Sequence, residues 1–149
     1  MSAAADGNLA DLLPQQPPFR FVDTVDECEP GRSVLARYRL TGREAFLTGH
    51  FPGNPVMPGV LQLEALAQTG AVAALADERF AHLLALFGGV DKVRFRRLVV
   101  PGDELVLRIT IDRLSPRGGW ADGTATVDGA LSCEARLLLA FAPVPAPGG

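Results

Sequence analysis

The sequence has few cysteines and no excess of positive charge. Cys28 and Cys133 are the only cysteines. They lie far apart, with no spacing typical of disulfides or metal ligands, so neither a disulfide framework nor a zinc site is expected. The net charge of −3 argues against a general nucleic-acid-binding protein. Two unpaired cysteines favour a reducing compartment, and the cytoplasm is the expected location.

The sequence also lacks the features of a secreted or membrane protein. Its first ten residues, MSAAADGNLA, have neither the basic region nor the apolar region of a signal peptide. Residues 56–76 are long enough to span a membrane, but Gln62, Glu64, Gln68 and Thr69 would make spanning costly. We therefore expect a buried helix here and no membrane association.

The composition is that of a single folded domain. The 149 residues are 48% hydrophobic and 21% charged, which is enough to form one shared core. Residues 1–7 and 143–149 are expected to be disordered, since the last seven, PVPAPGG, contain three prolines and two glycines. The domain is expected to cover residues 8–142.

Several segments have the patterns of strands. Residues 19–29 and 33–40 flank Pro30-Gly31, which predicts a β-hairpin. Residues 105–111 alternate strictly between apolar and polar side chains, which is typical of a half-buried strand. Asp128-Gly129 is a type I′ turn signal that joins residues 125–127 to a strand at 131–141. Before these strands, Asn8 is expected to cap a short helical segment.

The central segment has a different pattern. From Gly59 to Asp77 nearly every residue is Ala, Leu or Val, so the helix should be buried on most sides. One such helix and about six antiparallel strands predict an α+β protein with a curved antiparallel sheet wrapped around a long central helix. This is the hot-dog fold.

Polar residues interrupt this helix on one stripe. Val60, Glu64 and Gln68 follow at intervals of four, so they project in nearly the same direction. Burial disfavours an ionised carboxylate, which makes Glu64 a candidate proton donor. A buried glutamate can also serve only to satisfy backbone groups or a subunit contact. Gln68 is expected either to orient Glu64 or to hold a loop.

His50 precedes the helix and can supply a base. An imidazole suits a general base near pH 7, although a histidine beside a proline-rich turn can be purely structural. The helix start at Gly59 leaves backbone N–H groups that could hold a carbonyl oxygen as it gains negative charge. These groups together could remove a proton beside a thioester carbonyl and expel a β-hydroxyl as water. His82 has no acidic or nucleophilic neighbour in the sequence and is interpreted as structural.

The segment GHFPGNPVMPGVLQLEALAQ closely resembles the active-site segment of the 3-hydroxyacyl-acyl-carrier-protein dehydratases of bacterial type II fatty acid synthesis, in the form whose acid is glutamate. LLPQQPPFRFVDTVDECEPG, GGVDKVRFRRLVVPGDEL and GTATVDGALSCEARLLLAF resemble other segments of this family. The family often has histidine near Gln15 and Gln16, tyrosine at Leu86 beside Phe87, and proline at Leu98. None of these differences affects His50 or Glu64.

The resemblance implies roles for individual residues. His50 would take the α-proton, Glu64 would protonate the departing hydroxyl, and the Gly59 N–H would bind the thioester oxygen. Further substrate-binding residues would be Phe51, Pro58, Val60 and Gln68. No metal or dissociable cofactor would be needed, because the substrate is carried on the phosphopantetheine arm of an acyl carrier protein.

The resemblance also implies partners. The site would form across a homodimer, with histidine from one subunit and glutamate from the other, and dimers could assemble further into trimers of dimers. A heterodimer with a related subunit is an alternative. Acyl carrier proteins are strongly acidic, and Lys92, Arg94, Arg96 and Arg97 could attract them. Alternation would place the first three on one face, although a solvated strand face would look the same.

Two alternative functions are also compatible with the sequence. A hot-dog thioesterase would not need the pairing of His50 with Glu64, and a catalytically silent subunit of a heterodimer would not need to retain both. A dehydratase that also isomerises the double bond typically has aspartate in place of Glu64. The dehydration would belong either to primary fatty acid synthesis or to a specialised polyene or polyketide pathway.

Overall fold

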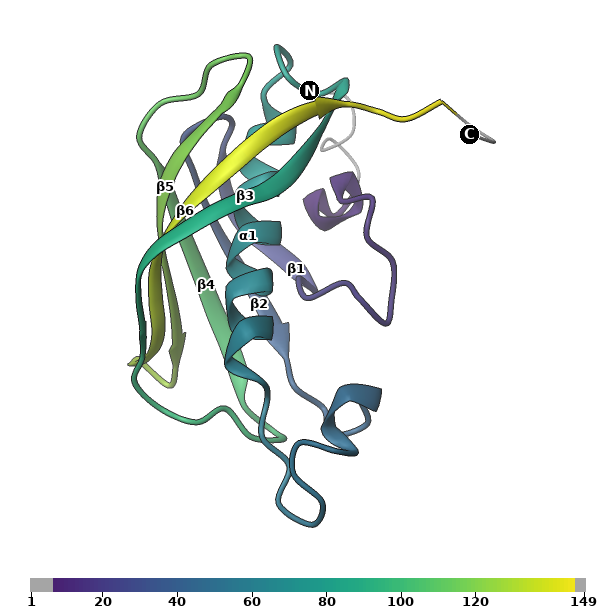
Figure 1. The fold of residues 1–149 in the computed structure, drawn as a ribbon, viewed down its shortest axis with the longest axis vertical. Helices are drawn as coiled ribbons and strands as arrows, with labels where there is room; N and C mark the ends of the chain where they lie inside the picture. Colours follow the sequence, from purple (N-terminus) through teal and green to yellow (C-terminus); the bar gives the residue numbers. More distant parts are fainter. Residues whose placement is uncertain (1–6, 147–149) are drawn as a thin grey trace.

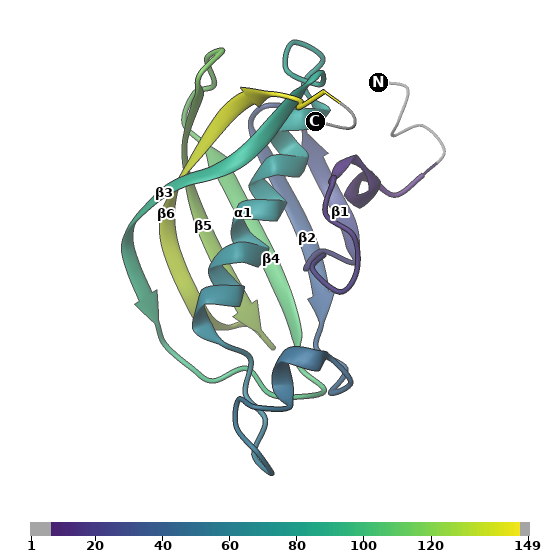
Figure 2. The same cartoon turned by 45° about the vertical axis from the view of Figure 1, so that its right-hand side comes forward.

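The computed structural model describes residues 7–146. Its elements, in chain order, are η1 (Leu9–Leu12), β1 (Thr24–Glu29), β2 (Ser33–Arg39), η2 (Ala45–Leu47), α1 (Gly59–Ala76), β3 (Leu83–Phe95), β4 (Glu104–Ile111), β5 (Gly118–Val127) and β6 (Ala130–Pro143). The six strands form one antiparallel sheet in the order β1-β2-β4-β5-β6-β3. The sheet curves around α1 (Figures 1 and 2), which confirms the predicted α+β hot-dog fold.

The two ends of the chain are described only in part. Residues 1–6 and 147–149, which belong to the segments expected to be disordered, lie outside the described residues. Gly7 and residues 144–146 are in neither helix nor strand. The strand β6 continues through Pro143, one residue into the segment expected to be disordered.

The helix α1 is the centre of the core. It is apolar and long enough to cross a membrane by composition, but 78% of it is buried inside the protein, so it is a core helix as predicted. Its first turn and Glu64 are the exceptions. Val60 is 68% exposed and Glu64 is only half-buried, so the expectation of burial on most sides is wrong for this end of the helix in the single chain.

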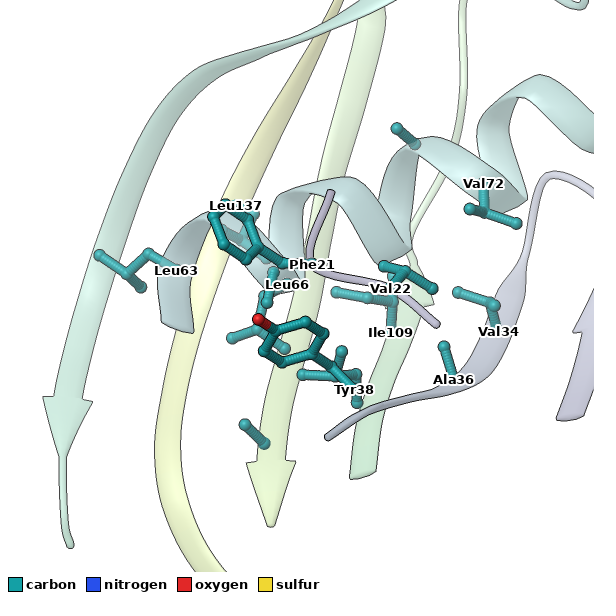
Figure 3. Close-up of a cluster of buried hydrophobic side chains, with 14 of the residues drawn as sticks. Phe21, Val22, Val34, Ala36, Tyr38, Leu63, Leu66, Val72, Ile109 and Leu137 are labelled. Atoms are coloured by element: carbon teal, nitrogen blue, oxygen red, sulfur yellow. The ribbon is translucent and has the colours of Figure 1, made fainter. Parts of the chain in front are cut away.

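The buried face of the sheet follows the predicted alternation. Leu105, Leu107, Ile109 and Ile111 of β4 all point into the core. Figure 3 shows Ile109 and Leu137 in the cluster of buried side chains around α1, with Phe21 and Val22 on the N-terminal segment. These last two residues were predicted to lie in the first strand of the hairpin, at residues 19–29, but β1 starts only at Thr24. Their side chains are almost fully buried and serve as core residues outside any strand.

Two turns follow the expected local rules. Glu29 and Ser33 end the β1–β2 hairpin, and Gly31 within it has a φ of 75°, a conformation that glycine adopts without a steric penalty. Asp128 and Gly129 have φ values of 50° and 79°, as a type I′ turn requires at both central residues. Both predicted hairpins are therefore confirmed.

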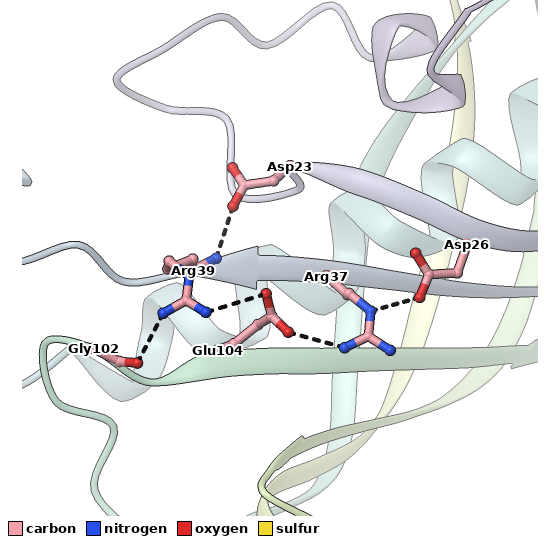
Figure 4. A network of polar contacts seen from close by, with 6 residues as sticks. All are labelled: Asp23, Asp26, Arg37, Arg39, Gly102 and Glu104. Carbon is pink, nitrogen blue, oxygen red and sulfur yellow. Dashed lines mark hydrogen bonds and ion pairs between the residues drawn. The ribbon is translucent and has the colours of Figure 1, made fainter.

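Charged side chains cross the first three strands of the sheet. Arg37 of β2 forms ion pairs with Asp26 of β1 and Glu104 of β4 (Figure 4). Arg39 forms an ion pair with Glu104 and donates a hydrogen bond to the carbonyl oxygen of Gly102. The Asp23 carboxylate accepts a hydrogen bond from the Arg39 backbone N–H. These partly exposed pairs contribute little stability individually, but they link β1, β2 and β4.

A bulge in β3 changes the phase of its side chains. Asp91 pairs with Arg136 and Arg94 with Glu134, so β3 holds one residue more than β6 between these pairs. Lys92, at the bulge, has a φ of 53°. The predicted alternation of Lys92, Arg94 and Arg96 on one face is therefore wrong, and Arg96 lies beyond the end of the strand.

Candidate active site

His50 lies in the segment between η2 and α1, which projects at the end of the molecule where α1 begins (Figures 1 and 2). Its Nδ1 is 2.8 Å from the carbonyl oxygen of Val56, and its own carbonyl oxygen accepts the Val56 N–H at 2.7 Å. The Phe51 ring stacks on the imidazole with centroids 4.2 Å apart. Backbone bonds and stacking together hold the imidazole in one orientation.

These contacts determine which ring nitrogen is free. A carbonyl oxygen can only accept a hydrogen bond, so Nδ1 carries the proton when the imidazole is neutral. Nε2 then has the lone pair. His50 is half-buried, so this nitrogen is presented as a base at a partly enclosed site.

Glu64 is held by Gln68, one turn further along α1. Gln68 Nε2 donates to Glu64 Oε2 at 2.9 Å and to the Phe19 carbonyl oxygen at 3.0 Å. Gln68 Oε1 accepts the Phe21 N–H at 2.8 Å. Gln68 therefore does both of the things proposed for it, since it orients Glu64 and holds the N-terminal segment.

The backbone partners also fix the orientation of the Gln68 amide. Phe21 N–H requires an acceptor and the Phe19 carbonyl requires a donor, so the oxygen and nitrogen of the amide cannot be exchanged. Gln68 thus donates to one oxygen of Glu64, which is Oε2 in this structure. The other oxygen, Oε1, remains as the one that can carry and deliver a proton.

The start of α1 provides backbone donors. The N-cap residue is Pro58, which makes no side-chain cap hydrogen bond. Within residues 7–146, the N–H groups of Gly59 and Val60 have no acceptor. They lie at the positive end of the helix dipole, where a developing negative charge is stabilised.

An apolar cavity lies beside this part of α1. It has a volume of about 260 Å³ and is lined mainly by Pro18, Phe19, Phe21, Phe46 and Leu61. Leu61 precedes Glu64 by one turn, and the Phe19 carbonyl is bound by Gln68. The cavity is therefore next to the candidate acid. The sequence did not indicate the role of Phe19 and Phe21, because their contact with Gln68 spans almost fifty residues of chain.

Two titratable groups near this cavity have shifted pKa values. Burial raises the pKa of the Tyr38 hydroxyl, helped by the charges of Glu44 and Asp23. Burial would also raise the pKa of Glu44, but hydrogen bonds from the Thr41 and Gly42 backbone N–H groups outweigh it, so this pKa is lowered. Glu44 is therefore ionised and Tyr38 neutral at neutral pH.

The remaining candidates occupy other places. His82 is exposed in the turn between α1 and β3. Arg96 forms an ion pair with Glu134 at 3.1 Å, whereas Lys92, Arg94 and Arg97 have no carboxylate partner within the described residues. Over residues 7–146, no group of three or more His, Cys, Asp or Glu side chains is arranged to hold a metal ion.

Comparison with known proteins identifies one family. The FabA-like domain matches residues 13–136. A 3-hydroxyacyl-(acyl-carrier-protein) dehydratase FabZ from Oenococcus oeni is 54% identical over 127 residues, covering 85% of this chain and 91% of the relative. The FabZ of Moorella thermoacetica is 52% identical over 129 residues, covering 87% of this chain and 90% of the relative.

Among solved structures, the dehydratase heterocomplex ApeI:P from Xenorhabdus doucetiae contains a similar chain. Its TM-score is 0.74 at 17% sequence identity, with 95% of this chain and 93% of that chain covered. At this identity the likeness concerns the fold alone.

Proposed function

This chain belongs to the FabZ-type 3-hydroxyacyl-acyl-carrier-protein dehydratases of the FabA-like family, and from this membership we propose that His50 is the base and Glu64 the acid of its reaction. The enzyme converts a 3-hydroxyacyl group on an acyl carrier protein into the trans-2-enoyl group in fatty acid biosynthesis. The observation that carries the proposed roles is the pair of fixed orientations, that of His50 by Val56 and that of Glu64 by Gln68.

The proposed reaction balances within the substrate and two side chains. His50 Nε2 takes the α-proton, and the electrons of the broken C–H bond form the new double bond. The bond between the β-carbon and oxygen breaks, and the hydroxyl leaves as water with a proton from Glu64 Oε1. His50 is then protonated and Glu64 ionised, and transfer of one proton between them restores the enzyme.

The backbone N–H groups of Gly59 and Val60 are proposed to bind the thioester oxygen. Loss of the α-proton places negative charge on this oxygen, and donors already in position stabilise it without reorganisation. The phosphopantetheine arm or the acyl group is proposed to contact Phe51, Pro58 and Val60, which lie at or near these donors in the sequence. The chemistry requires no metal or dissociable cofactor.

The site is proposed to form between two copies of the chain. β3 is an edge strand, and Leu86, Phe87, Val90 and Phe95 on it are large, apolar and exposed. A second copy pairing along β3 would cover these residues and could also cover Val60 and Glu64. We propose a homodimer with two such sites, as a soluble assembly of the cytoplasm; pairing with a related subunit and assembly into a trimer of dimers are the other arrangements.

Exchange of inactive subunits tests both the roles and the shared site. His50→Ala and Glu64→Gln should each lower turnover of a 3-hydroxyacyl carrier thioester by about 10²-fold or more, measured as loss of water by mass spectrometry. His82→Ala is the matched control and should keep wild-type turnover. Near-wild-type turnover of either active-site variant would refute the role of that residue.

A mixture of the two inactive variants should recover activity if each site takes histidine from one subunit and glutamate from the other. The hybrid would then contain one intact pair. No recovery after subunit exchange has been demonstrated by native mass spectrometry would refute the shared site.

Carrier docking is proposed at Lys92, Arg94 and Arg97, with a smaller part for Arg96, because Glu134 already neutralises it. Lys92→Glu combined with Arg94→Glu should raise KM for the carrier substrate and reduce its salt dependence. A pantetheine thioester without the carrier should react as before. Arg113→Glu, an exposed cation beyond the end of β4, is the control. Equal effects on both substrates would contradict docking.

The two alternative functions have less support. The FabZ relatives at about half identity are named as dehydratases rather than thioesterases. Formation of the enoyl product by the purified chain alone would exclude a silent subunit, and release of free acid without enoyl product would instead support hydrolysis.

A further inference from the structure

The ring of Phe95 lies directly against the first residue of α1. A Cβ atom placed on Gly59 would be 2.9 Å from Phe95 Cε1, 3.1 Å from Cζ and 3.2 Å from Cδ1. Real Cβ atoms do not approach other atoms as closely as the first of these distances. The ring thus fills the space in which any other residue at position 59 would place its side chain.

The strand β3 directs the ring towards the helix. Phe95 is the last residue of β3 and pairs with Cys133 of β6, which is fully buried. Directly opposite residues in an antiparallel pair share a face, so Phe95 points to the inner side of the sheet. The next residue is fixed too, because the Arg96 N–H donates to the Ser132 carbonyl oxygen at 2.8 Å. The ring therefore has a well-anchored backbone.

Packing within one chain does not bury this residue completely. Phe95 is 51% exposed in the single chain, which leaves a large apolar surface for the second copy proposed above to cover. The helix start beside it has no side-chain cap, and the N–H groups of Gly59 and Val60 are without acceptors in the described chain. A rigid aromatic ring beside uncapped donors can hold the first turn in place and keep water from one side of it.

We propose that Phe95 is a positioning residue, which presses on Gly59 and so fixes the backbone donors that bind the thioester oxygen. This inference rests on the proposed function and extends it by one residue on a different element. Gly59 is then required for two reasons that act together: its N–H is a donor, and its lack of a side chain admits the ring. Hydrogen bonds to a developing oxyanion are stronger where water is excluded, so the ring would raise kcat more than it lowers KM.

Substitution of Phe95 tests the kinetic part. Removal of one oxyanion donor costs about 10²–10³ in kcat in a well-studied case, so loosening one by Phe95→Ala should cost about 10-fold. KM should change little, and Phe95→Leu, which keeps an apolar side chain, should recover part of the loss. Leu98→Ala is the matched control, because Leu98 is 67% exposed and lies three residues further along. Wild-type kcat in Phe95→Ala would overturn the proposal.

A double-mutant cycle tests the contact. Gly59→Ala should lower kcat because its methyl group meets the ring. In the Phe95→Ala background the same methyl group has space, so adding Gly59→Ala should cost several-fold less than it does in the wild type. Additive losses would show that the two residues act independently and would refute a common action.

An infrared measurement separates positioning from support of the fold. The carbonyl stretching frequency of a bound 2-enoyl thioester should fall on binding to the wild type, and part of this shift should be lost in Phe95→Ala. A loss of activity with the full infrared shift would overturn the proposal, since the ring would then act through folding or assembly. If the wild type itself shows no shift, the Gly59 N–H does not bind the thioester oxygen, and this part of the proposed function is refuted. A shift in the wild type that Phe95→Ala retains refutes only the inference.

Discussion

Replacement of Gln68 by leucine should damage stability and catalysis at the same time. The Gln68 side chain is 1% exposed and makes three hydrogen bonds, to Phe19, Phe21 and Glu64. Leucine has a similar volume and fills the space, but it can neither donate nor accept. The substitution therefore removes the hydrogen bonds while leaving the packing nearly intact.

The expected loss of stability depends on which hydrogen-bond partners of Gln68 can bond to water instead. The Phe21 N–H is buried and would stay unpaired, which costs about 1–3 kcal/mol. Phe19 and Glu64 are partly exposed, so each lost bond there should cost roughly 0.5–1 kcal/mol. The apolar surface of leucine offsets part of this sum. We expect the free energy of unfolding to fall by about 2 kcal/mol, measured by urea denaturation.

Turnover should fall by about 10-fold or more, because Glu64 loses the donor that orients it as an acid. Gln62→Leu is the matched control: Gln62 is also buried on α1, but its partner is the Ser132 hydroxyl, which has the Ala125 carbonyl oxygen as a second acceptor. It should cost about 1 kcal/mol or less and leave turnover unchanged. If Gln68→Leu loses stability but keeps wild-type kcat, Gln68 only holds the N-terminal segment and the reasoning on Glu64 is refuted.

Two further predictions concern stability. Glu44 has a lowered pKa in the folded state, so its carboxylate stabilises the fold above the unfolded value of 4.5 and ceases to do so as the pH falls through the folded pKa. Glu44→Gln should therefore destabilise the protein at neutral pH and progressively less as the pH falls below 4.5, in urea titrations at a series of pH values; an equal difference at every pH would contradict this. Gly123→Ala would place a Cβ 2.9 Å from Ile109 Cδ1 and 3.0 Å from Leu137 Cδ1, so it should cost about 1–3 kcal/mol, whereas Gly49→Ala, with no atom within 4 Å, should be nearly neutral.

Local patterns predicted most of the fold. The alternation at residues 105–111, the Asp128-Gly129 turn and the apolar run from Gly59 each depend on neighbours within a few positions, and all three appear as expected. The candidate base and acid were also identified from the sequence, because the helical period and the proline-rich turn are local features. Their catalytic roles stay predictions that the subunit experiments test.

Contacts between distant segments decided the rest. The bulge at Lys92 arises from the pairing of β3 with β6. No pattern within β3 alone could therefore indicate that the side chains of Lys92 and Arg94 do not share a face of the strand. The start of β1 at Thr24 and the bonds of Gln68 to Phe19 and Phe21 likewise depend on where the N-terminal segment meets α1.

The sequence by itself therefore determined the elements, the turns and the chemistry available at His50 and Glu64, since these depend on residue type and short spacing. Only the tertiary structure decided which nitrogen of His50 is free, which oxygen of Glu64 is bound, and that Phe95 occupies the space beside Gly59. Hydrogen bonds and steric contacts act over only a few ångströms. They form only after the chain has folded and brought these atoms together.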